Sequence, residues 1–280
     1  MFQTIVKIFL LVIITAAITP FIRKLAFVLG AVDNPNARRI NKKPMPTIGG
    51  LAIFVAFNIG EFVLLRKDFP THELFSVLLA SSVIILTGLI DDILELKPRQ
   101  KMFGIFVASL VVYFLAGIKV RELSLPFLGH IQLGWWSFPL TIFWILALTN
   151  AVNLIDGLDG GVTLISLVTM GIVGFFFLKS WQHYVPIMCI MLAACLLGFL
   201  PYNFHPAKIF LGDTGALYIG FMISVLSLKG LKNVTFVSLL VPILILGVPI
   251  TDTVYAMIRR KLNKKNISQA DKHHLHHQLM

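Results

Sequence analysis

The sequence predicts an all-α fold, a polytopic integral membrane bundle of about nine transmembrane helices. Hydrophobic residues make up 57% of the 280 residues, whereas Asp, Glu, Lys and Arg make up only 13%, against roughly 25% in soluble domains. The mean hydropathy is +0.87. Long apolar runs approach the roughly 20 residues that cross a hydrocarbon core of about 30 Å. The composition therefore excludes a soluble single-domain enzyme and a disordered chain.

The apolar runs follow one another without a repeat or a second domain, so residues 1–280 are predicted to form one membrane domain. The runs lie at about 2–22, 48–66, 74–92, 102–117, 135–151, 162–180, 183–201, 213–229 and 235–257. Arg23 and Lys24 follow the first run, which is the wrong polarity for a cleaved signal peptide. We therefore expect a retained first helix with its N-terminus outside. Glycine and proline punctuate residues 118–134 and predict a small extracellular hairpin there.

The basic residues predict the orientation of the bundle. The chain has 24 Lys and Arg against 13 Asp and Glu, which gives a formal net charge of +11. Most of the basic residues fall in the connections that this topology places on one side: 23–47, 93–101, 152–161, 202–212 and 258–280. That side is predicted to be cytoplasmic. Because no nucleic-acid module accompanies the charge, we attribute it to the membrane and to anionic substrates, and expect no nucleic-acid partner.

Five carboxylates collect at helix ends on the predicted cytoplasmic side. Asp91 and Asp92 end the third run, Asp156 and Asp159 follow the fifth, and Asp213 opens the eighth. One carboxylate at the end of a membrane helix is ordinary. Convergence from three separate connections predicts a functional site.

Each of these carboxylates has a structural alternative. The pair Asp91 and Asp92 could be a solvated helix end, although acidic groups at a helix C-terminus need a cation or a basic partner to offset the dipole. Mg²⁺ is the natural cation, since it takes one or two carboxylates together with phosphate oxygens. Asp213 could be the N-cap of the eighth helix, but the flanking Gly212 and Gly215 indicate close approach by another group.

Two further segments are rich in polar groups. Residues 150–161 hold two Asn, two Asp and three Gly, which suits either an ordinary turn or, as we favour, a polar cavity lined by side-chain acceptors and backbone N–H groups. In the tail, residues 271–277 carry four histidines near many basic residues. This pattern favours phosphate recognition or proton transfer, with a zinc site or an interfacial basic helix as alternatives.

Five blocks of the sequence carry a resemblance to a known family. They are Asp33–Gly50, Gly88–Asp92, Asn150–Gly161, Gly198–Gly215 and Ala270–His277. With these blocks in family order, the chain resembles the polyprenyl-phosphate N-acetylhexosamine-1-phosphate transferases, of the glycosyltransferase family 4 type. These are integral membrane enzymes that start cell-wall and surface-polymer synthesis. Family members continue through one or two further helices after the histidines, so we expect this chain to lack those helices.

The resemblance implies transfer of a phospho-N-acetylhexosamine from a UDP-sugar to a polyprenyl phosphate, with Mg²⁺, or Mn²⁺ in its place, and release of UMP. It implies as metal ligands Asp213, Asp156 and Asp92, and as catalytic residues Asp91, Asp92, Asp156, His274, His276 and His277. The implied substrate-binding residues are Lys42, Lys101, Asn153, Asp159, Asn203 and Phe210. The ring of Phe210 would stack on uracil. Membrane lipid is a further partner, and a homodimer is compatible with the family.

The order of the histidines indicates the branch of the family. His274-Leu275-His276-His277 resembles the branch that uses UDP-GlcNAc and undecaprenyl phosphate, which would start teichoic acid or surface polysaccharide synthesis. A phospho-MurNAc-pentapeptide transferase of peptidoglycan synthesis is the alternative within the family. Outside it, a cation-coupled transporter would use embedded carboxylates such as Asp252, and an inactive homologue would act only as a partner.

Overall fold

The computed structural model describes residues 2–33, 44–64, 71–125, 129–178, 184–229, 234–235 and 247. The described chain is mostly helical. Four helices are long and apolar enough to cross a membrane: Ile5–Leu29, Thr71–Leu94, Gly134–Leu154 and Tyr184–Asn203. Shorter apolar helices include Gly50–Val63 and Gly161–Phe175. These helices support the predicted class, a helical membrane protein.

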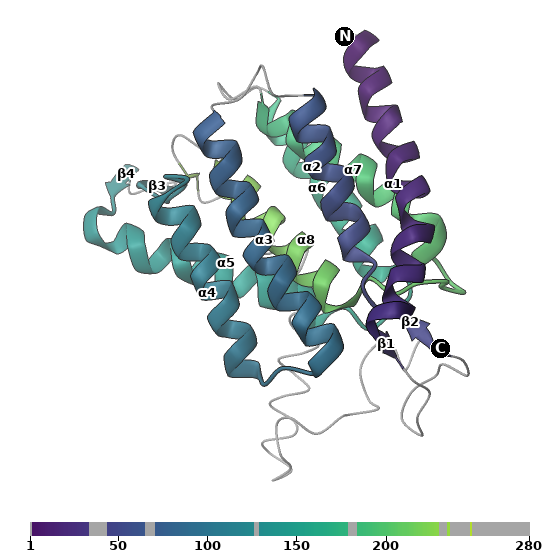
Figure 1. The fold of residues 1–280 in the computed structure, drawn as a ribbon. Coiled ribbons are helices and arrows are strands. Elements are labelled where there is room, and N and C mark those ends of the chain that lie inside the picture. Colours follow the sequence, from purple (N-terminus) through teal and green to yellow (C-terminus); the bar gives the residue numbers. More distant parts are fainter. Residues whose placement is uncertain are drawn as a thin grey trace.

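The helices occur in the order that the apolar runs predict (Figure 1). They are α1 (Phe2–Leu29), α2 (Gly50–Leu64), α3 (Thr71–Leu94), α4 (Pro98–Phe114), α5 (Ser137–Leu154), α6 (Gly161–Phe177), α7 (Tyr184–Asn203) and α8 (Gly212–Lys229). Each of the first eight apolar runs overlaps one of these helices. The ninth run, 235–257, lies outside the described residues except for residues 235 and 247.

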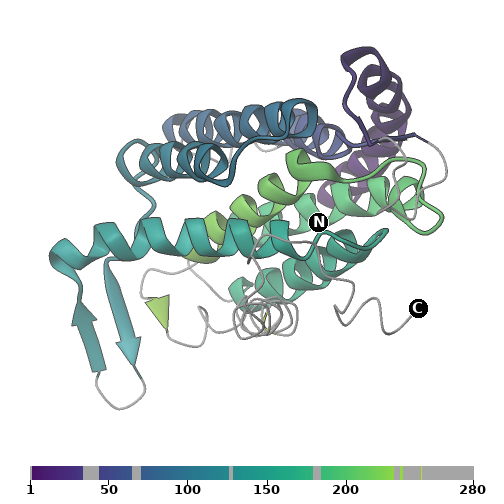
Figure 2. The ribbon, with the colours of Figure 1, turned by 90° about the horizontal axis from the view of Figure 1, so that it is seen from below.

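Short strands accompany the helices. Strands β1 (Val32–Asp33) and β2 (Met45–Pro46) are antiparallel. Strands β3 (Glu122–Leu125) and β4 (Gly129–Gln132) form an antiparallel hairpin, and β5 (Val234–Thr235) pairs parallel with β3. The hairpin lies beside the start of α5 (Figure 2). In the chain, the short helix η1 (Gly134–Trp136) separates the hairpin from α5. The hairpin predicted within residues 118–134 is therefore confirmed.

Helix α1 is longer than the sequence predicted. The apolar run that predicts this helix extends to about residue 22, but the helix continues to Leu29 and contains the two basic residues that follow the run. Long basic side chains can bury their stems and keep their charge at the surface, so they need not end a helix. The end is set by Gly30, whose φ of +73° suits the residue after a helix. The N–H of Ala31 then donates to the carbonyl of Ala26 at 3.0 Å.

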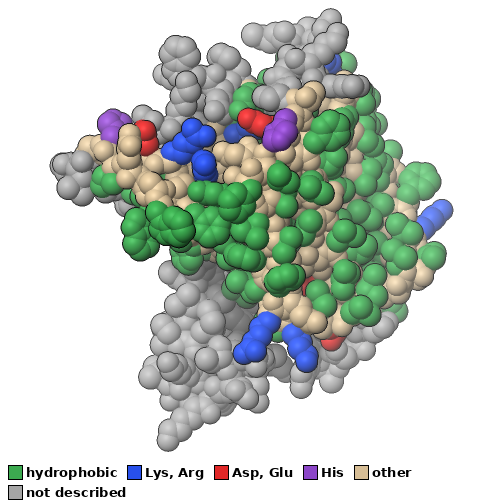
Figure 3. Space-filling model, turned by 60° about the vertical axis from the view of Figure 1, so that its left-hand side comes forward, with side chains coloured by type: hydrophobic (Ala, Val, Ile, Leu, Met, Phe, Trp, Pro, Cys, Tyr) green, Lys and Arg blue, Asp and Glu red, His purple; other side chains and the backbone are tan. Residues whose placement is uncertain are grey.

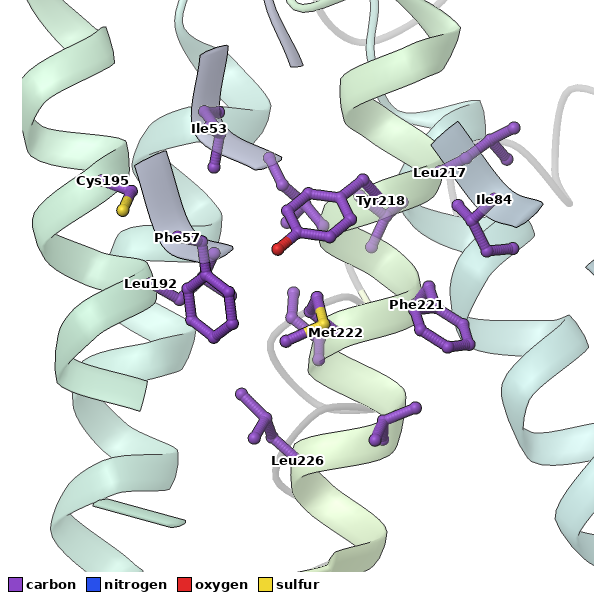
Figure 4. Close-up of a cluster of buried hydrophobic side chains, with 14 of the residues drawn as sticks. Ile53, Phe57, Ile84, Leu192, Cys195, Leu217, Tyr218, Phe221, Met222 and Leu226 are labelled. Atoms are coloured by element: carbon purple, nitrogen blue, oxygen red, sulfur yellow. The ribbon is translucent and has the colours of Figure 1, made fainter. Parts of the chain in front are cut away.

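Helix α8 forms the centre of the bundle. Its residues from Thr214 to Lys229 are all buried, and it packs against α2, α3 and α5. Figure 4 shows Tyr218 of α8 in the same buried cluster as Phe57 of α2 and Leu192 of α7. The ring of Phe54 meets that of Tyr218 edge-on, with centroids 5.5 Å apart. A helix that is buried on every side fixes the position of any residue at its ends.

The outer surface of the helices is apolar. Large hydrophobic side chains are exposed along several helices, among them Phe9, Phe103, Phe143 and Phe175. Figure 3 shows how densely hydrophobic side chains cover one such face. An apolar surface of this extent would favour aggregation in water, whereas lipid covers it without cost.

Successive helices run in opposite directions, so their connections meet at two ends of the bundle. The α1–α2 and α7–α8 connections bond to each other, because Phe210 donates its N–H to the carbonyl of Pro46 at 2.8 Å. The last turns of α3 and α5 contact the first turns of α4 and α8 through the side chains described below. We call this the connection end; it is the lower end in Figure 1, and the N-terminus lies at the other.

Candidate active site

Three polar side chains from three helices meet at the connection end. Lys101, in the first turn of α4, places its Nζ atom 2.7 Å from Oδ1 of Asp213, which opens α8. Asn153, in the last turn of α5, donates its amide to the same oxygen. The Nζ of Lys101 also lies 3.3 Å from Oδ1 of Asn153. The three residues form one hydrogen-bonded cluster, although 112 positions separate the first from the last.

Asp91 joins this cluster through Lys101. Its Oδ2 atom forms an ion pair with the same Nζ, and its Oδ1 accepts the N–H of Leu96 at 2.8 Å. Asp91 is only 5% exposed. Of the two interpretations open for this carboxylate, a buried side chain with a basic partner is the correct one, and the partner is Lys101.

Asp92, its neighbour, points instead at the start of α8. Its carboxylate accepts the backbone N–H of Asp213 at 3.0 Å and that of Thr214 at 2.9 Å. The hydroxyl of Thr214 donates to the same carboxylate at 2.5 Å. The first turn of α8 is therefore capped by Asp92. The Asp213 side chain, which the sequence suggested as a possible N-cap, faces Lys101 and Asn153.

Asp156 and Asp159 lie in the connection that follows α5. Burial, together with the negative charges of Asp213, Asp92 and Asp159, raises the pKa of Asp156 to about 8. Asp159 bonds to the loop before α8, since its Oδ2 lies 3.1 Å from Nδ1 of His205 and accepts the N–H of Ala207 at 3.2 Å. Asp156 thus lies near Asp213 and Asp92, whereas Asp159 bonds to the adjacent loop.

The glycines beside Asp213 bring backbone segments together. A Cβ atom on Gly212 would lie 1.6 Å from the carbonyl oxygen of Thr47, and one on Gly50 would lie 2.0 Å from the Cα of Gly215. The sequence indicated that something approaches these glycines closely. The start of α2 occupies that space.

Two other predicted substrate residues lie between the end of α7, which is Asn203, and the start of α8. Asn203 is 3% exposed; its side-chain oxygen accepts the hydroxyl of Thr163 at 2.7 Å, and its amide donates to the carbonyl of Ile209 at 3.2 Å. These bonds give Asn203 a loop-holding role. Phe210 is half-buried, and its carbonyl accepts the N–H of Gly49 at 3.0 Å. Its backbone is thus fixed three residues before Asp213.

The remaining predicted site residues cannot be placed. Lys42 and the tail residues His274, His276 and His277 lie outside the described residues. Their assignment stays a prediction. The structure therefore brings Asp91, Asp92, Lys101, Asn153 and Asp213 into direct contact, with Asp156 nearby.

Two residues of this arrangement were not identified from the sequence. Thr214 bonds to Asp92, and Gly88, one turn before Asp92, lies so close to α8 that a Cβ atom would be 2.5 Å from the Cα of Thr214. The signal was the spacing of Gly88 and Asp92, since residues four apart share one face of a helix. The partner of that face could not be read from the spacing.

Mg²⁺ fits this site only if one or two carboxylates of the protein are enough to bind it. No group of three or more His, Cys, Asp or Glu side chains that could hold a metal was found within the described part of the chain. Mg²⁺ is usually bound by one or two carboxylates plus substrate phosphates and water. The groups that shift the pKa of Asp156 are all carboxylates, so its surroundings favour a cation. Asp156 and Asp213 are therefore a donor set that suits Mg²⁺.

Comparisons with known proteins show which sequences this chain is similar to. The family described as Glycosyl transferase family 4 matches residues 74–231, a range that includes the side-chain cluster. A Bacillus subtilis protein named "Probable undecaprenyl-phosphate N-acetylglucosaminyl 1-phosphate transferase" is 43% identical over 265 residues, covering 94% of this chain and 73% of the relative.

More distant relatives include proteins named for N-acetylglucosamine phosphate transfer and proteins named for phospho-N-acetylmuramoyl-pentapeptide transfer. The decaprenyl-phosphate N-acetylglucosaminephosphotransferase of Mycolicibacterium smegmatis is 33% identical, over 96% of this chain and 73% of its own length. The phospho-N-acetylmuramoyl-pentapeptide-transferase of Clostridium botulinum is 32% identical, over 91% of this chain and 81% of its own length.

Proposed function

Because the chain belongs to glycosyl transferase family 4, we propose that it transfers GlcNAc-1-phosphate from UDP-GlcNAc to undecaprenyl phosphate and releases UMP. The product would start a surface polymer such as teichoic acid. The observation that carries the proposal is the cluster of Lys101, Asn153 and Asp213, which unites three helix ends beside an apolar outer surface. A site of this kind can receive a nucleotide from water and a prenyl chain from lipid.

The choice of sugar rests on the relatives. The relative named for N-acetylglucosaminyl 1-phosphate transfer is 43% identical, against 32% for the phospho-N-acetylmuramoyl-pentapeptide-transferase. The order of the tail histidines favours the same branch. We therefore assign UDP-GlcNAc as donor and undecaprenyl phosphate as acceptor.

In the proposed reaction, an oxygen of the prenyl phosphate attacks the β-phosphorus of UDP-GlcNAc. A new P–O bond forms, and the bond to the UMP oxygen breaks. Both reactants are anions, so positive charge must offset their repulsion. Lys101 provides one charge, held in place by Asp91 and Asp213. Mg²⁺ or Mn²⁺, held by Asp213 and Asp156, would supply more charge when bound.

Other residues have supporting roles in the proposal. Phe210 would stack on the uracil, and Asp159 and Asn203 hold the loop that presents it. Lys42 and the histidines at 274, 276 and 277 would serve the phosphates. We further propose nine spans with the N-terminus outside, so that the connection end faces the cytoplasm, where UDP-sugars are made. The basic residues of these connections support that orientation.

An assay of the purified chain in detergent tests the function. UDP-GlcNAc, undecaprenyl phosphate and Mg²⁺ should together give UMP and a lipid-linked GlcNAc phosphate, and omitting the lipid phosphate should stop UMP release. Replacing the donor by UDP-MurNAc-pentapeptide should give no product. Turnover with the pentapeptide donor alone would assign the other branch. Ion flux in vesicles without any transfer would favour a transporter.

A further inference from the structure

Helix α8 begins without a side chain of its own to cap it. The first backbone N–H groups of a helix lack partners within the helix. The usual remedy is a polar side chain at the N-cap, but the residue before α8 is Leu211 and the first residue of α8 is Gly212, at a φ of +72°. A Cβ atom there would collide with the backbone of Thr47. Water cannot replace the missing partner at Thr214, which is fully buried.

Asp92 supplies the missing partner from a different helix. One carboxylate accepts two backbone N–H groups and one hydroxyl, at 3.0, 2.9 and 2.5 Å, all from Asp213 and Thr214. The partial positive charge at the start of α8 also favours a carboxylate at this place. Asp92 ends α3, where its own helix dipole is unfavourable, so the contact with α8 resolves the charge problem that the sequence posed.

Gly88 makes this contact possible. It lies one turn before Asp92 on the same face of α3, and a Cβ atom would be 2.5 Å from Cα and 2.7 Å from N of Thr214. The last turn of α3 and the first turn of α8 therefore touch through their backbones. At this separation the Asp92 carboxylate reaches both N–H groups at ordinary hydrogen-bond lengths.

The neighbouring aspartates thus have different partners. Asp91 pairs with Lys101, and Asp213 accepts bonds from Lys101 and Asn153. Both oxygens of Asp92 already accept bonds from the α8 backbone. With the hydroxyl of Thr214, these donors occupy three of the roughly four lone-pair positions of the carboxylate, which leaves about one position for a proton or a metal ion.

We propose that Asp92 is a positioning residue: with Thr214 it caps α8 and so fixes the direction in which Asp213 presents its carboxylate to the substrates. The expected effect of Asp92 on turnover rests on the proposed function. The capping of α8 by Asp92 does not depend on that function. It replaces the metal-ligand and catalytic roles that the family resemblance implied for Asp92.

Substitutions at Asp92 separate a cap from a base or a ligand. Asp92→Asn keeps one oxygen that can accept bonds from Thr214 and loses the other, whereas Asp92→Ala loses both. Replacing a capping side chain by Ala costs roughly 0.5–2 kcal/mol. The kcat of Asp92→Asn should therefore stay within about tenfold of the wild-type value. The kcat of Asp92→Ala should be lower than that of Asp92→Asn by about 2- to 30-fold. The Mg²⁺ concentration for half-maximal activity should stay unchanged in Asp92→Asn. Equal losses of about 10²–10⁴ in both variants, or a raised Mg²⁺ requirement, would overturn the proposal.

Thr214 provides a matched pair that leaves Asp92 intact. Thr214→Ser keeps the hydroxyl, whereas Thr214→Val keeps the shape and loses it. We expect Thr214→Val to lower kcat by about 3- to 10-fold, the equivalent of one hydrogen bond. Thr214→Ser should restore most of this loss. Equal activity of the two variants would contradict a cap that uses the hydroxyl.

Hydrogen exchange tests the cap without any turnover. In the full chain, amides of the peptide that spans residues 211–217 should exchange faster in Asp92→Ala than in wild type, with a smaller increase in Asp92→Asn, which keeps one acceptor oxygen. Unchanged exchange in Asp92→Ala would overturn the proposal. If the wild-type chain releases no UMP from the named substrates, the proposed function fails, while the exchange result still decides whether Asp92 caps α8.

Discussion

Each end of the bundle holds a lysine among carboxylates, but the two groups are arranged differently. At the connection end, Lys101 is the cation found in contact with Asp91 and Asp213, and further carboxylates lie nearby. At the other end, the Nζ of Lys229 lies 2.5 Å from Oε2 of Glu73 and 4.5 Å from the ring centre of Tyr184. Glu61, 1% exposed in α2, is within electrostatic range of the same lysine.

This difference helps to distinguish a site from a structural ion pair. Lys229 is the last residue of α8, Glu73 lies in the first turn of α3, and Tyr184 is the first residue of α7. The ion pair and the contact with the ring therefore join the ends of these three helices. At the connection end the carboxylate of Asp213 is 33% exposed and Asp156 lies nearby, so a cation can still reach the carboxylates there. The predictions below test whether turnover depends on one end and stability on the other.

The largest effect should come from Asp213→Asn. This change keeps the shape and an acceptor for Lys101 and Asn153 but removes the charge that faces the substrates. We expect turnover to fall by about 10³ or more, because loss of charge stabilisation at a phosphoryl centre is worth several kcal/mol. UMP release by the purified variant provides the measurement.

The controls for Asp213→Asn address folding and metal. The variant should elute from size exclusion as the wild type does, since Asp213 is partly exposed and its backbone bonds to Asp92 remain. Wild type in excess chelator should lose the same activity and regain it with Mg²⁺. Full turnover of wild type in chelator would contradict a metal at this end.

A smaller effect is expected from Phe210→Ala. Stacking of a base on an aromatic ring is worth about 1–3 kcal/mol, so the KM for UDP-GlcNAc should rise by roughly one to two decades with kcat little changed. Phe143→Ala provides a matched control, because Phe143 is 67% exposed on α5 and lies on the apolar outer surface. Equal KM values in the two variants would mean that Phe210 only packs against the chain.

A pH dependence of up to about tenfold per pH unit should follow from Asp156. Its pKa of about 8 lies above the ordinary 3.8 because of burial and the carboxylates around it. Below about pH 8, Mg²⁺ must displace a proton, so the Mg²⁺ concentration for half-maximal activity should fall as the pH rises from about 6 to 8 and then level off. The slope should be absent in Asp156→Asn. A pH-independent Mg²⁺ requirement in wild type would contradict a role for this carboxyl.

Much of the fold could be predicted because each apolar run must become a helix in lipid. The carboxylates at 91, 92, 156 and 213 could be predicted to lie on one side of the membrane for a related reason. Helices that cross the membrane in alternating directions place every second connection on the same side. The end of α1 lies beyond the predicted apolar run, because the helix includes the two charged residues that follow the run and ends only before Gly30.

The partners within the site could not be predicted in the same way. Nothing in the sequence around residue 92 indicates that its carboxylate bonds to N–H groups 121 and 122 positions later. That contact depends on how closely α3 crosses α8, which Gly88 and Gly212 permit but do not specify. Asn203 was missed as a loop-holding residue for the same reason, because its partner Thr163 lies on another helix.

The smallest effect on turnover is expected at the opposite end, from Lys229→Met. The change removes the cation that pairs with Glu73 and Tyr184, and a bond to a charged group contributes about 1.5–3 kcal/mol. Thermal unfolding in detergent should therefore occur about 3–10 °C lower. The kcat and the Mg²⁺ requirement, measured well below that temperature, should match wild type. Lys229→Arg should recover most of the stability because it keeps the charge. A loss of kcat in Lys229→Met without a loss of stability would show that the two ends are coupled, and that the ion pair is more than a clamp on the helices.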